Sequence, residues 1–322
     1  MSLHILPSLF GLVAAMLVAG TSHAAYPEHP VKLVVPYAAG GPTDTFARAL
    51  SEVWGKTLGT TIVVENKAGA GTMLGTTAVA KAVADGYTIL LSTVAHSVNP
   101  SLHQNLAYDP VKDFASVGLA ARAPLVLVVN KDLPVKTLPE FLDYLKQRPG
   151  TVNYSSAGVG SAPHLGGALL NYMGKLDARH VPYRGSAPAM ADVIGGHVEF
   201  MIDSAPTALA QVRAGTVRIL ATTMDQRLSQ TPDVPAIAEA IPGYEAYTWN
   251  AVLAPAGTPE VIIEKLRASL EKALNGEGLQ QKADTMGLLL EKQPTPKALD
   301  VFIAAEVNKW RDVVKASEMS TK

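Results

Sequence analysis

Short apolar runs alternate in this chain with glycine-rich breaks and helix-forming segments, and this alternation limits the folds that it can adopt. Residues 31–36 form a β-branched run that ends at a proline. The turn-forming residues 40–43 then separate this predicted strand from a helical pattern that continues to about Gly59. Residues 61–65 and 88–91 are further strands of the same kind. Strands joined through helices pair in parallel, with helices on both faces of the sheet. The sequence therefore predicts a mostly parallel α/β sheet.

The second half repeats the alternation and contains two apolar crossings. Further strands are expected near residues 124–129, 153–155, 179–183, 198–202 and 217–221. Residues 248–255 resemble residues 124–129 in their apolar content. Two such crossings on either side of a middle α/β region predict two lobes joined by two strands, an arrangement that can hinge. We place the first lobe at residues 26–123 and 249–322 and the second lobe at residues 124–248; one undivided sheet is the alternative.

Length and composition exclude several functions. The 322 residues suggest about two domains. Lys and Arg number 27 against 28 Asp and Glu, so the chain has no basic surplus for binding nucleic acid. It has no cysteine, and its 8 histidines show no metal-ligand spacing, so we expect no disulfide, no thiol nucleophile and no metal site. The sequence shows no dinucleotide-binding or P-loop motif, and we expect no cofactor.

The N-terminus has the pattern of an export signal. Residues 9–19 form an apolar run that is too short to span a bilayer, which takes roughly 20 residues. Ser22 and Ala24 supply the small residues of a cleavage site. We therefore predict a signal peptide over residues 1–25 and a periplasmic location, although the segment before the apolar run lacks Lys and Arg. A hydrophobic helix retained in the mature fold is the alternative.

Two loops have the composition of anion sites. Residues 38–44, with the sequence AAGGPTD, lie between the end of a predicted strand and the start of a helix, which is where open α/β sheets bind ligands. Residues 155–164 have the same setting in the other half and add serine hydroxyls. Free N–H groups at a helix N-terminus suit a carboxylate. The alternative for the first loop is a tight turn before a capped helix.

Three polar residues in the second half of the chain have alternative roles. Ser161, His164 and Asp203 are the residue types of a serine hydrolase, but Val159 and Pro163 occupy the glycine positions of a nucleophile elbow around Ser161. Asp203 follows a predicted strand, where it receives a ligand ammonium or hydroxyl group, or else caps the next helix.

Seven sequence motifs follow one another between residues 34 and 259. They are VVPYAAGGPTDTFAR at 34–48, VVENKAGAG at 63–71, ADGYTIL at 84–90, GSAPHLGG at 160–167, VPYRGSAPA at 181–189, GGHVE at 195–199 and APAGTP at 254–259. Together they resemble the Bug-type receptors, the substrate-binding proteins of tripartite tricarboxylate transporters. The resemblance covers nearly all of the chain that follows the predicted signal peptide.

The resemblance implies a fold and a function. The fold is a type II periplasmic binding protein, a two-lobed Venus-flytrap α/β structure with a ligand cleft between lobes joined by two hinge strands. The implied function is that of a receptor without enzymatic activity, which binds a small carboxylate such as an organic acid or an acidic amino acid. The implied partner is the membrane permease of a tripartite tricarboxylate transporter, and presentation of the ligand to a sensor kinase is the alternative. We expect the protein to be a monomer.

Members of this family grip a ligand carboxylate between the first loop and the serine-rich loop of the other lobe. A third loop, whose side chains vary, tunes ligand choice in the family. Carried onto the matching positions, the resemblance predicts the ligand-binding residues Tyr37, Ala39, Gly40, Gly41, Asp44, Thr93, His96, Ser97, Ser155, Ser156, Gly160, Ser161, Tyr183, Gly185 and Asp203.

Overall fold

A computed structural model of the chain describes residues 26–183 and 185–316. The strands are β1 Val31–Val35, β2 Ile62–Asn66, β3 Thr88–Ser92, β4 Phe114–Asn130, β5 Asn153–Ser156, β6 Arg179–Pro182, β7 Phe200–Ser204, β8 Val217–Thr222, β9 Tyr247–Pro255 and β10 Leu289–Leu290. The α-helices are α1 Pro42–Leu58, α2 Met73–Ala80, α3 Ala95–Leu102, α4 Leu138–Lys146, α5 Ala162–Gly174, α6 Ser186–Ile194, α7 Ala205–Arg213, α8 Glu260–Leu274, α9 Glu277–Thr285 and α10 Pro296–Ala316. Two short 3-10 helices are η1 Ala70–Thr72 and η2 Ile237–Glu239.

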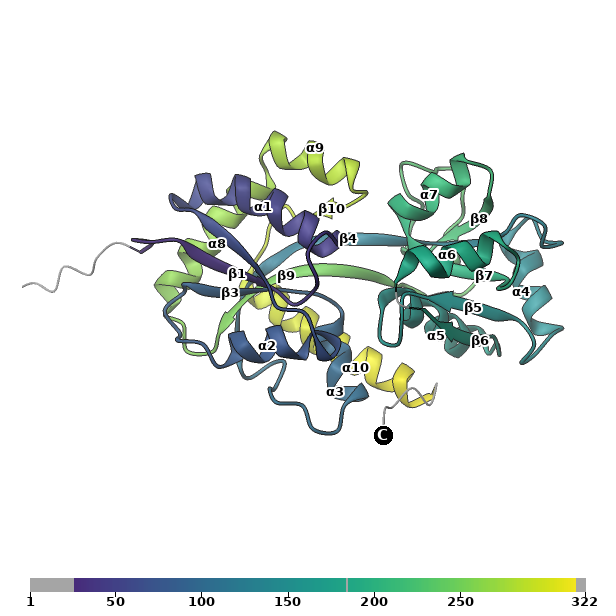
Figure 1. Cartoon of the computed structure of the whole chain (residues 1–322), viewed down its shortest axis with the longest axis horizontal. Helices are drawn as coiled ribbons and strands as arrows, with labels where there is room; N and C mark the ends of the chain where they lie inside the picture. The colour runs from purple at the N-terminus through teal and green to yellow at the C-terminus, as the bar shows by residue number, and fades with distance from the viewer. Residues whose placement is uncertain (1–25, 184, 317–322) are drawn as a thin grey trace, which may run out of the picture.

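Two lobes lie side by side, and two long strands run between them (Figure 1). The strand order is β2-β1-β3-β9-β4-β7-β5-β6, and β8 and β10 also pair with β4. The strands β1 to β3, β9 and β10 belong to the first lobe, and β5 to β8 belong to the second. Among the described residues, β4 is the one strand through which the two groups are hydrogen-bonded. The predicted mostly parallel sheet is mixed, because β9 pairs antiparallel with β3 and β4, and β4 pairs antiparallel with β7 and β8.

The first lobe has helices on both faces of its sheet. The helices α1 and α8 pack on one face, where Phe46, Trp54 and Leu266 are buried against the strands. Burying an apolar side chain of this size stabilises a fold by about 1.5–3 kcal/mol. The buried Trp54 indole also donates a hydrogen bond to Ser269 Oγ on α8, at 2.8 Å. The helices α2, α3 and α10 lie on the opposite face (Figure 1).

The strand β4 changes partner along its 17 residues. It pairs with β9 as far as Pro124, which lies opposite Tyr247. From the next residue, Leu125, it pairs with β7 and soon afterwards with β8. The predicted crossings near residues 124–129 and 248–255 are thus β4 and β9. The first half of β4 escaped prediction because it contains small residues and Gly118 in place of a β-branched run.

The helix α10 is a third link between the lobes. It packs on α3 and β4 and also contacts α5 of the second lobe. Its buried Glu306 accepts hydrogen bonds from the indole nitrogens of Trp249, at 3.1 Å, and Trp310, at 2.9 Å. Because Trp249 belongs to β9, this pair fixes α10 against a strand that crosses between the lobes.

The predicted signal peptide over residues 1–25 lies outside the described residues. Within the described part of the chain, none of the helices combines the length and apolarity that a membrane span requires.

Candidate ligand-binding site

A cavity of about 490 Å³ lies between the two lobes, at the C-terminal ends of β1, β3 and β7. Loops of the first lobe form one wall, and the starts of α5, α6 and α7 form the other. Ala123, Leu125 and Thr248 on the crossing strands also line it. The cavity wall includes these residues predicted from sequence: Tyr37, Gly40, Gly41, Thr93, Gly160, Ser161 and Asp203.

The cavity receives the N-terminal ends of several helices. Pro42 of α1, Pro163 of α5, Ser186 of α6 and Pro206 of α7 all line it. First-turn N–H groups have no partner within their own helix, and the helix dipole is positive at this end. The lining residues that the structure describes include no lysine, arginine or histidine. An anion bound here would be stabilised by backbone N–H groups, hydroxyls and helix dipoles.

The first loop is held in shape by Asp44, which lies behind it. The Asp44 carboxylate accepts hydrogen bonds from the N–H group of Gly40 at 2.8 Å, from Arg48 Nε at 3.0 Å and from Asn66 Nδ2 at 2.9 Å. The hydrogen bond from Arg48 is the main cause that lowers the pKa of Asp44 to about 2. Gly40 has a φ of 83°, which a side chain would strain. Asp44 therefore positions the Gly40–Gly41 backbone and does not itself line the cavity.

The second loop is braced by its own serines. Ser161 is the N-cap of α5, and its hydroxyl donates to the Gly158 carbonyl at 2.6 Å while accepting from the His164 N–H at 3.4 Å. Ser156 Oγ accepts from the Gly158 N–H at 3.1 Å and lies 2.6 Å from His180 Nε2. Ser156 thus shapes the turn from behind, whereas Ser161 faces the cavity.

Several predicted residues lie outside the cavity wall. His96 and Ser97 are buried within α3, where the resemblance had placed a loop, and His96 Nε2 hydrogen-bonds the Pro110 carbonyl at 2.8 Å. Burial lowers the pKa of His96 to about 4. The Tyr183 hydroxyl donates to Asp192. The remaining predicted residues that do not line the cavity are Ala39, Asp44, Ser155, Ser156 and Gly185.

Some lining residues escaped prediction from sequence. Ser186 begins α6, while Met286 and Leu288 follow α9 near the end of the chain. The VPYRGSAPA motif contains Ser186 and was a signal for it. We find no sequence signal for Met286 or Leu288, since neither lies in a glycine-rich or serine-rich loop.

Asp203 has an unusual environment for a carboxylate. It lies near the end of β7, is 1% exposed and accepts a hydrogen bond from Ser186 Oγ to its Oδ1 at 2.9 Å. Its Oδ2 is buried and has no hydrogen-bond partner in the described structure. Burial raises the pKa of Asp203 to about 6. The capping alternative is wrong, because Ser204 is the N-cap of α7 and no side chain makes a capping hydrogen bond there.

The serine hydrolase geometry is not assembled. His164 Nδ1 accepts from the Gly160 N–H at 3.0 Å, and its ring stacks on His180 with centroids 3.8 Å apart. The Ser161 hydroxyl donates its hydrogen bond to the Gly158 carbonyl, and Asp203 accepts a hydrogen bond from the Ser186 hydroxyl. A nucleophile must be hydrogen-bonded to its base, and the base to an orienting acid. Neither hydrogen bond is formed among these side chains.

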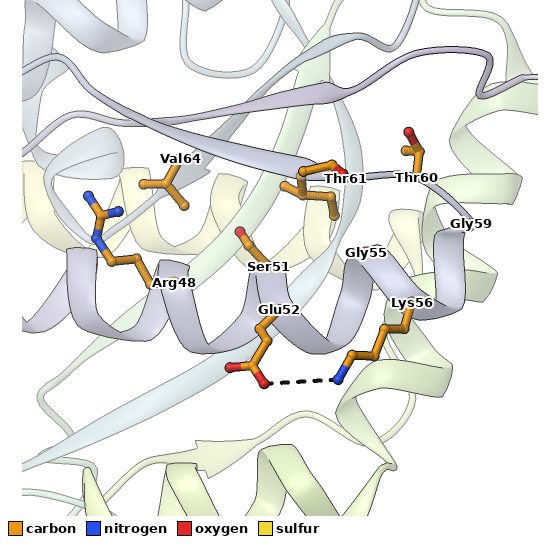
Figure 2. Close-up of a pocket in the computed structure, with 10 residues that line it drawn as sticks. Arg48, Ser51, Glu52, Gly55, Lys56, Gly59, Thr60, Thr61 and Val64 are labelled. Carbon is orange, nitrogen blue, oxygen red and sulfur yellow. Dashed lines mark ion pairs between the residues drawn. The ribbon is translucent and has the colours of Figure 1, made fainter.

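A larger hollow of about 680 Å³ lies elsewhere, between α1 and β2. Figure 2 shows Arg48, Glu52 and Lys56 along this face of α1, with an ion pair joining Glu52 and Lys56. Since β2 is the edge strand of the first lobe, this hollow lies at the outer edge of that lobe's sheet. It is an open groove with exposed ion pairs, and the inter-lobe cavity is the better candidate for a ligand site.

Known proteins share this architecture and sequence. Residues 46–319 match the tripartite tricarboxylate transporter family receptor, TctC. The structure of the periplasmic binding protein BugD is 37% identical, with a TM-score of 0.78 over 92% of this chain and 100% of that chain. Rhodopseudomonas palustris Rpa4515 with adipate is 34% identical, with a TM-score of 0.79 over 91% and 98% of the two chains. MatC from the same organism, with bound malate, is 36% identical, with a TM-score of 0.77 over 90% and 100%.

These similarities confirm the fold class predicted from sequence, a two-lobed α/β periplasmic binding protein. They also confirm the resemblance to Bug-type receptors that the seven motifs indicated. Since the family match extends over most of the chain, the protein belongs to the tripartite tricarboxylate transporter family of receptors.

Proposed function

We propose that this protein is a periplasmic receptor that binds a small carboxylate between its lobes and delivers it to the membrane permease of a tripartite tricarboxylate transporter. The observation that carries the proposal is the inter-lobe cavity, where four helix N-termini meet loop hydroxyls and glycine backbone. That donor set suits an organic acid or an acidic amino acid. Adipate in Rpa4515 and malate in MatC support this class of ligand.

Binding and lobe closure are one event in this proposal. The Gly40–Gly41 backbone belongs to the first lobe and Ser161 to the second, so a bridging ligand makes contacts in the closed state that the open state lacks. Only such a difference can shift the lobes. We place the lobes at residues 26–123 with 249–322 and at residues 124–248. The change of partner on β4 between Pro124 and Leu125 supports this boundary.

The proposal includes export and a non-enzymatic role. The predicted signal peptide over residues 1–25 would direct the chain to the periplasm, where the mature protein acts as a monomer. The absence of a Ser161–His164 side-chain hydrogen bond among the described residues supports binding without turnover. Ligand recovered unaltered after long incubation with the protein is the expected result.

Calorimetry on residues 26–322 tests the binding function. The panel contains small mono-, di- and tricarboxylates and acidic amino acids, with the amide of each acid as its matched control. A true ligand at a hundredfold excess over its dissociation constant should raise the free energy of unfolding by about 2.7 kcal/mol. The neutral amide should give no stabilisation. A flat response across the whole panel would contradict carboxylate binding.

Transport is tested separately in cells. Deleting the genes for the receptor or for the membrane permease should each abolish uptake of the ligand that calorimetry identifies. Uptake that persists without the permease, while binding in vitro is intact, would contradict delivery to that partner and leave the binding function standing.

A further inference from the structure

We propose that Asp203 accepts a hydrogen bond from a hydroxyl or ammonium group of the ligand, so that the cavity selects a carboxylate carrying such a donor over the unsubstituted acid. The inference rests on the proposed carboxylate-binding function and adds the substrate class to it.

The two oxygens of Asp203 differ in their surroundings. Oδ1 accepts from Ser186 Oγ at 2.9 Å, which fixes the plane of the carboxyl group. Oδ2 is buried, and no described atom donates to it. Burying a polar atom without a hydrogen-bond partner destabilises a structure, and more so when the atom is charged. A donor on the ligand would supply the missing hydrogen bond.

The position of Asp203 suits this role. It lines the same cavity as the Gly40–Gly41 backbone and Ser161, and it lies on β7 of the second lobe, whereas the first loop belongs to the first lobe. A short ligand whose carboxylate meets the helix N-termini therefore has the rest of its carbon chain within the cavity that Asp203 lines. Ser204 and Ser186 flank Asp203 in this wall, so the donor would meet a polar part of the cavity.

The charge of the cavity also favours a ligand that carries a hydrogen-bond donor. Asp203 is the one acidic or basic residue among the lining residues that the structure describes. An unsubstituted acid would gain no attractive contact at this carboxylate. A ligand that also carries an N–H or O–H donor gains an attractive contact at the same place. Sites built around a buried polar group reject analogues that lack its partner.

A matched ligand series tests the inference on the chain over residues 26–322. Succinate, malate and aspartate share one four-carbon dicarboxylate skeleton. At one carbon, succinate has no substituent, malate carries a hydroxyl group and aspartate carries an ammonium group. If these four-carbon acids do not bind, the three-carbon series propionate, lactate and alanine and the five-carbon series glutarate, 2-hydroxyglutarate and glutamate replace them. Calorimetry gives the dissociation constant of each member. Which substituted acid binds more tightly decides between a hydroxyl and an ammonium donor.

The substitution Asp203→Asn keeps the shape of the side chain and its acceptor for Ser186. In the wild type, a substituted acid should bind at least about tenfold more tightly than its parent, as expected for one charge-assisted hydrogen bond. In Asp203→Asn this ratio should fall about tenfold, because the substituted acid loses its charge-assisted hydrogen bond and the unsubstituted acid is no longer repelled by a carboxylate. Asp225→Asn, an exposed carboxylate of the same lobe, should leave the ratio unchanged. Ser186→Ala is the second variant. It removes the hydroxyl that donates to Oδ1, so the Asp203 carboxyl group is no longer held in one plane and the ratio should fall.

Two results separate the inference from the proposed function. If acids bind but the ratio is the same in the wild type and Asp203→Asn, or if the unsubstituted parent binds best, the inference is wrong and carboxylate binding stands. If no acid of any series or of the wider panel binds, the proposed function itself is wrong. An equal loss for every ligand in Asp203→Asn would also overturn the inference, because it would show that Asp203 maintains the wall without contacting the donor.

Discussion

The hydroxyl groups of Tyr37 and Thr93 lie 2.6 Å apart, so one hydrogen bond joins the loop after β1 to the residue that follows β3 at the edge of the cavity. Both residues line the cavity and both belong to the first lobe. The wall that they form is therefore fixed before the lobes close, and its rigidity can be measured.

Replacing Tyr37 by Phe should weaken this wall. The variant leaves the buried Thr93 hydroxyl without its partner, and we expect a loss of about 0.5–1.5 kcal/mol in the free energy of unfolding. Ligand affinity should fall severalfold, because the loop no longer has one fixed shape. Urea unfolding and calorimetry measure the two effects. Tyr172→Phe, at a half-exposed tyrosine on α5 outside the cavity wall, is the matched control.

Replacing Ser161 by Ala should have two separable effects. The change removes the N-cap of α5, which costs about 1 kcal/mol of stability, and it removes a cavity hydroxyl, which should weaken carboxylate binding about ten- to a hundredfold. Ser161→Thr keeps the hydroxyl oxygen and should preserve most of the stability and most of the carboxylate affinity. Thr137→Ala removes the N-cap of α4, outside the cavity wall. It should lower stability similarly without changing affinity.

If Ser161→Ala loses no more affinity than Thr137→Ala, Ser161 caps a helix and contributes nothing to the ligand. If it loses affinity but no stability, the hydrogen bond to the His164 N–H is not a working cap.

Replacing Gly167 by Ala should destabilise the second lobe. A Cβ atom at Gly167 would lie 2.2 Å from Tyr154 Cε2, and Tyr154 is a buried part of the core. Overpacking of this kind costs about 1–3 kcal/mol. Gly278→Ala on α9 meets nothing within 4 Å and should be neutral or stabilise by about 0.4–1 kcal/mol. Thermal unfolding of the two variants compares them directly, and equal melting temperatures would contradict the packing of Tyr154 on α5.

The pH dependence of binding should differ in sign between ligands. Since burial raises the pKa of Asp203 to about 6, the carboxyl group is protonated below this pH and ionised above it. An ionised Asp203 attracts an ammonium group, so the affinity for an amino acid should rise as pH increases through 6 and then level off. An unsubstituted dicarboxylate is repelled by the same charge, so its affinity should fall over the same window. Calorimetry between pH 5 and 8 measures both curves.

The surroundings of Asp203 make this assignment testable. Arg122 on β4, His164 on α5, Asp192 on α6 and Arg213 on α7 are ionisable groups on elements packed near β7, and none of them contributes to the pKa shift of Asp203. Burial lowers the pKa of His164 to about 3, so His164 stays neutral throughout the window. Asp203→Asn should flatten both curves. Curves that keep their shape in this variant would assign the titration to another group.

The parts of the site that local sequence specifies were predictable. A proline after a strand, two glycines and a helix-starting proline define the first loop, so residues 38–44 could be read without a structure. Ser161 could be recognised as a cavity residue for the same reason. These positions depend on local turn and capping chemistry, which a few neighbouring residues determine.

The parts that depend on distant contacts were not predictable. The hydrogen bond to Asp203 Oδ1 depends on where α6 places Ser186, and the braced position of Asp44 depends on Asn66 of β2. His96 lies in a buried helix because α3 packs against α10, which comes from the far end of the chain. In each case the sequence offers a suitable residue type, and the tertiary structure decides whether it faces the cavity.

The position of β9 between β3 and β4 affects how this chain can be divided. The first lobe contains a central strand, Tyr247–Pro255, that the ribosome makes only after the whole second lobe. A single cut anywhere in the second lobe therefore leaves no fragment with a complete first sheet. Pro124 and Tyr247 already lie opposite each other on paired strands. Excising the residues between them and closing the gap with a short turn would leave a continuous hairpin, so the second lobe is, in topological terms, an insertion into the first.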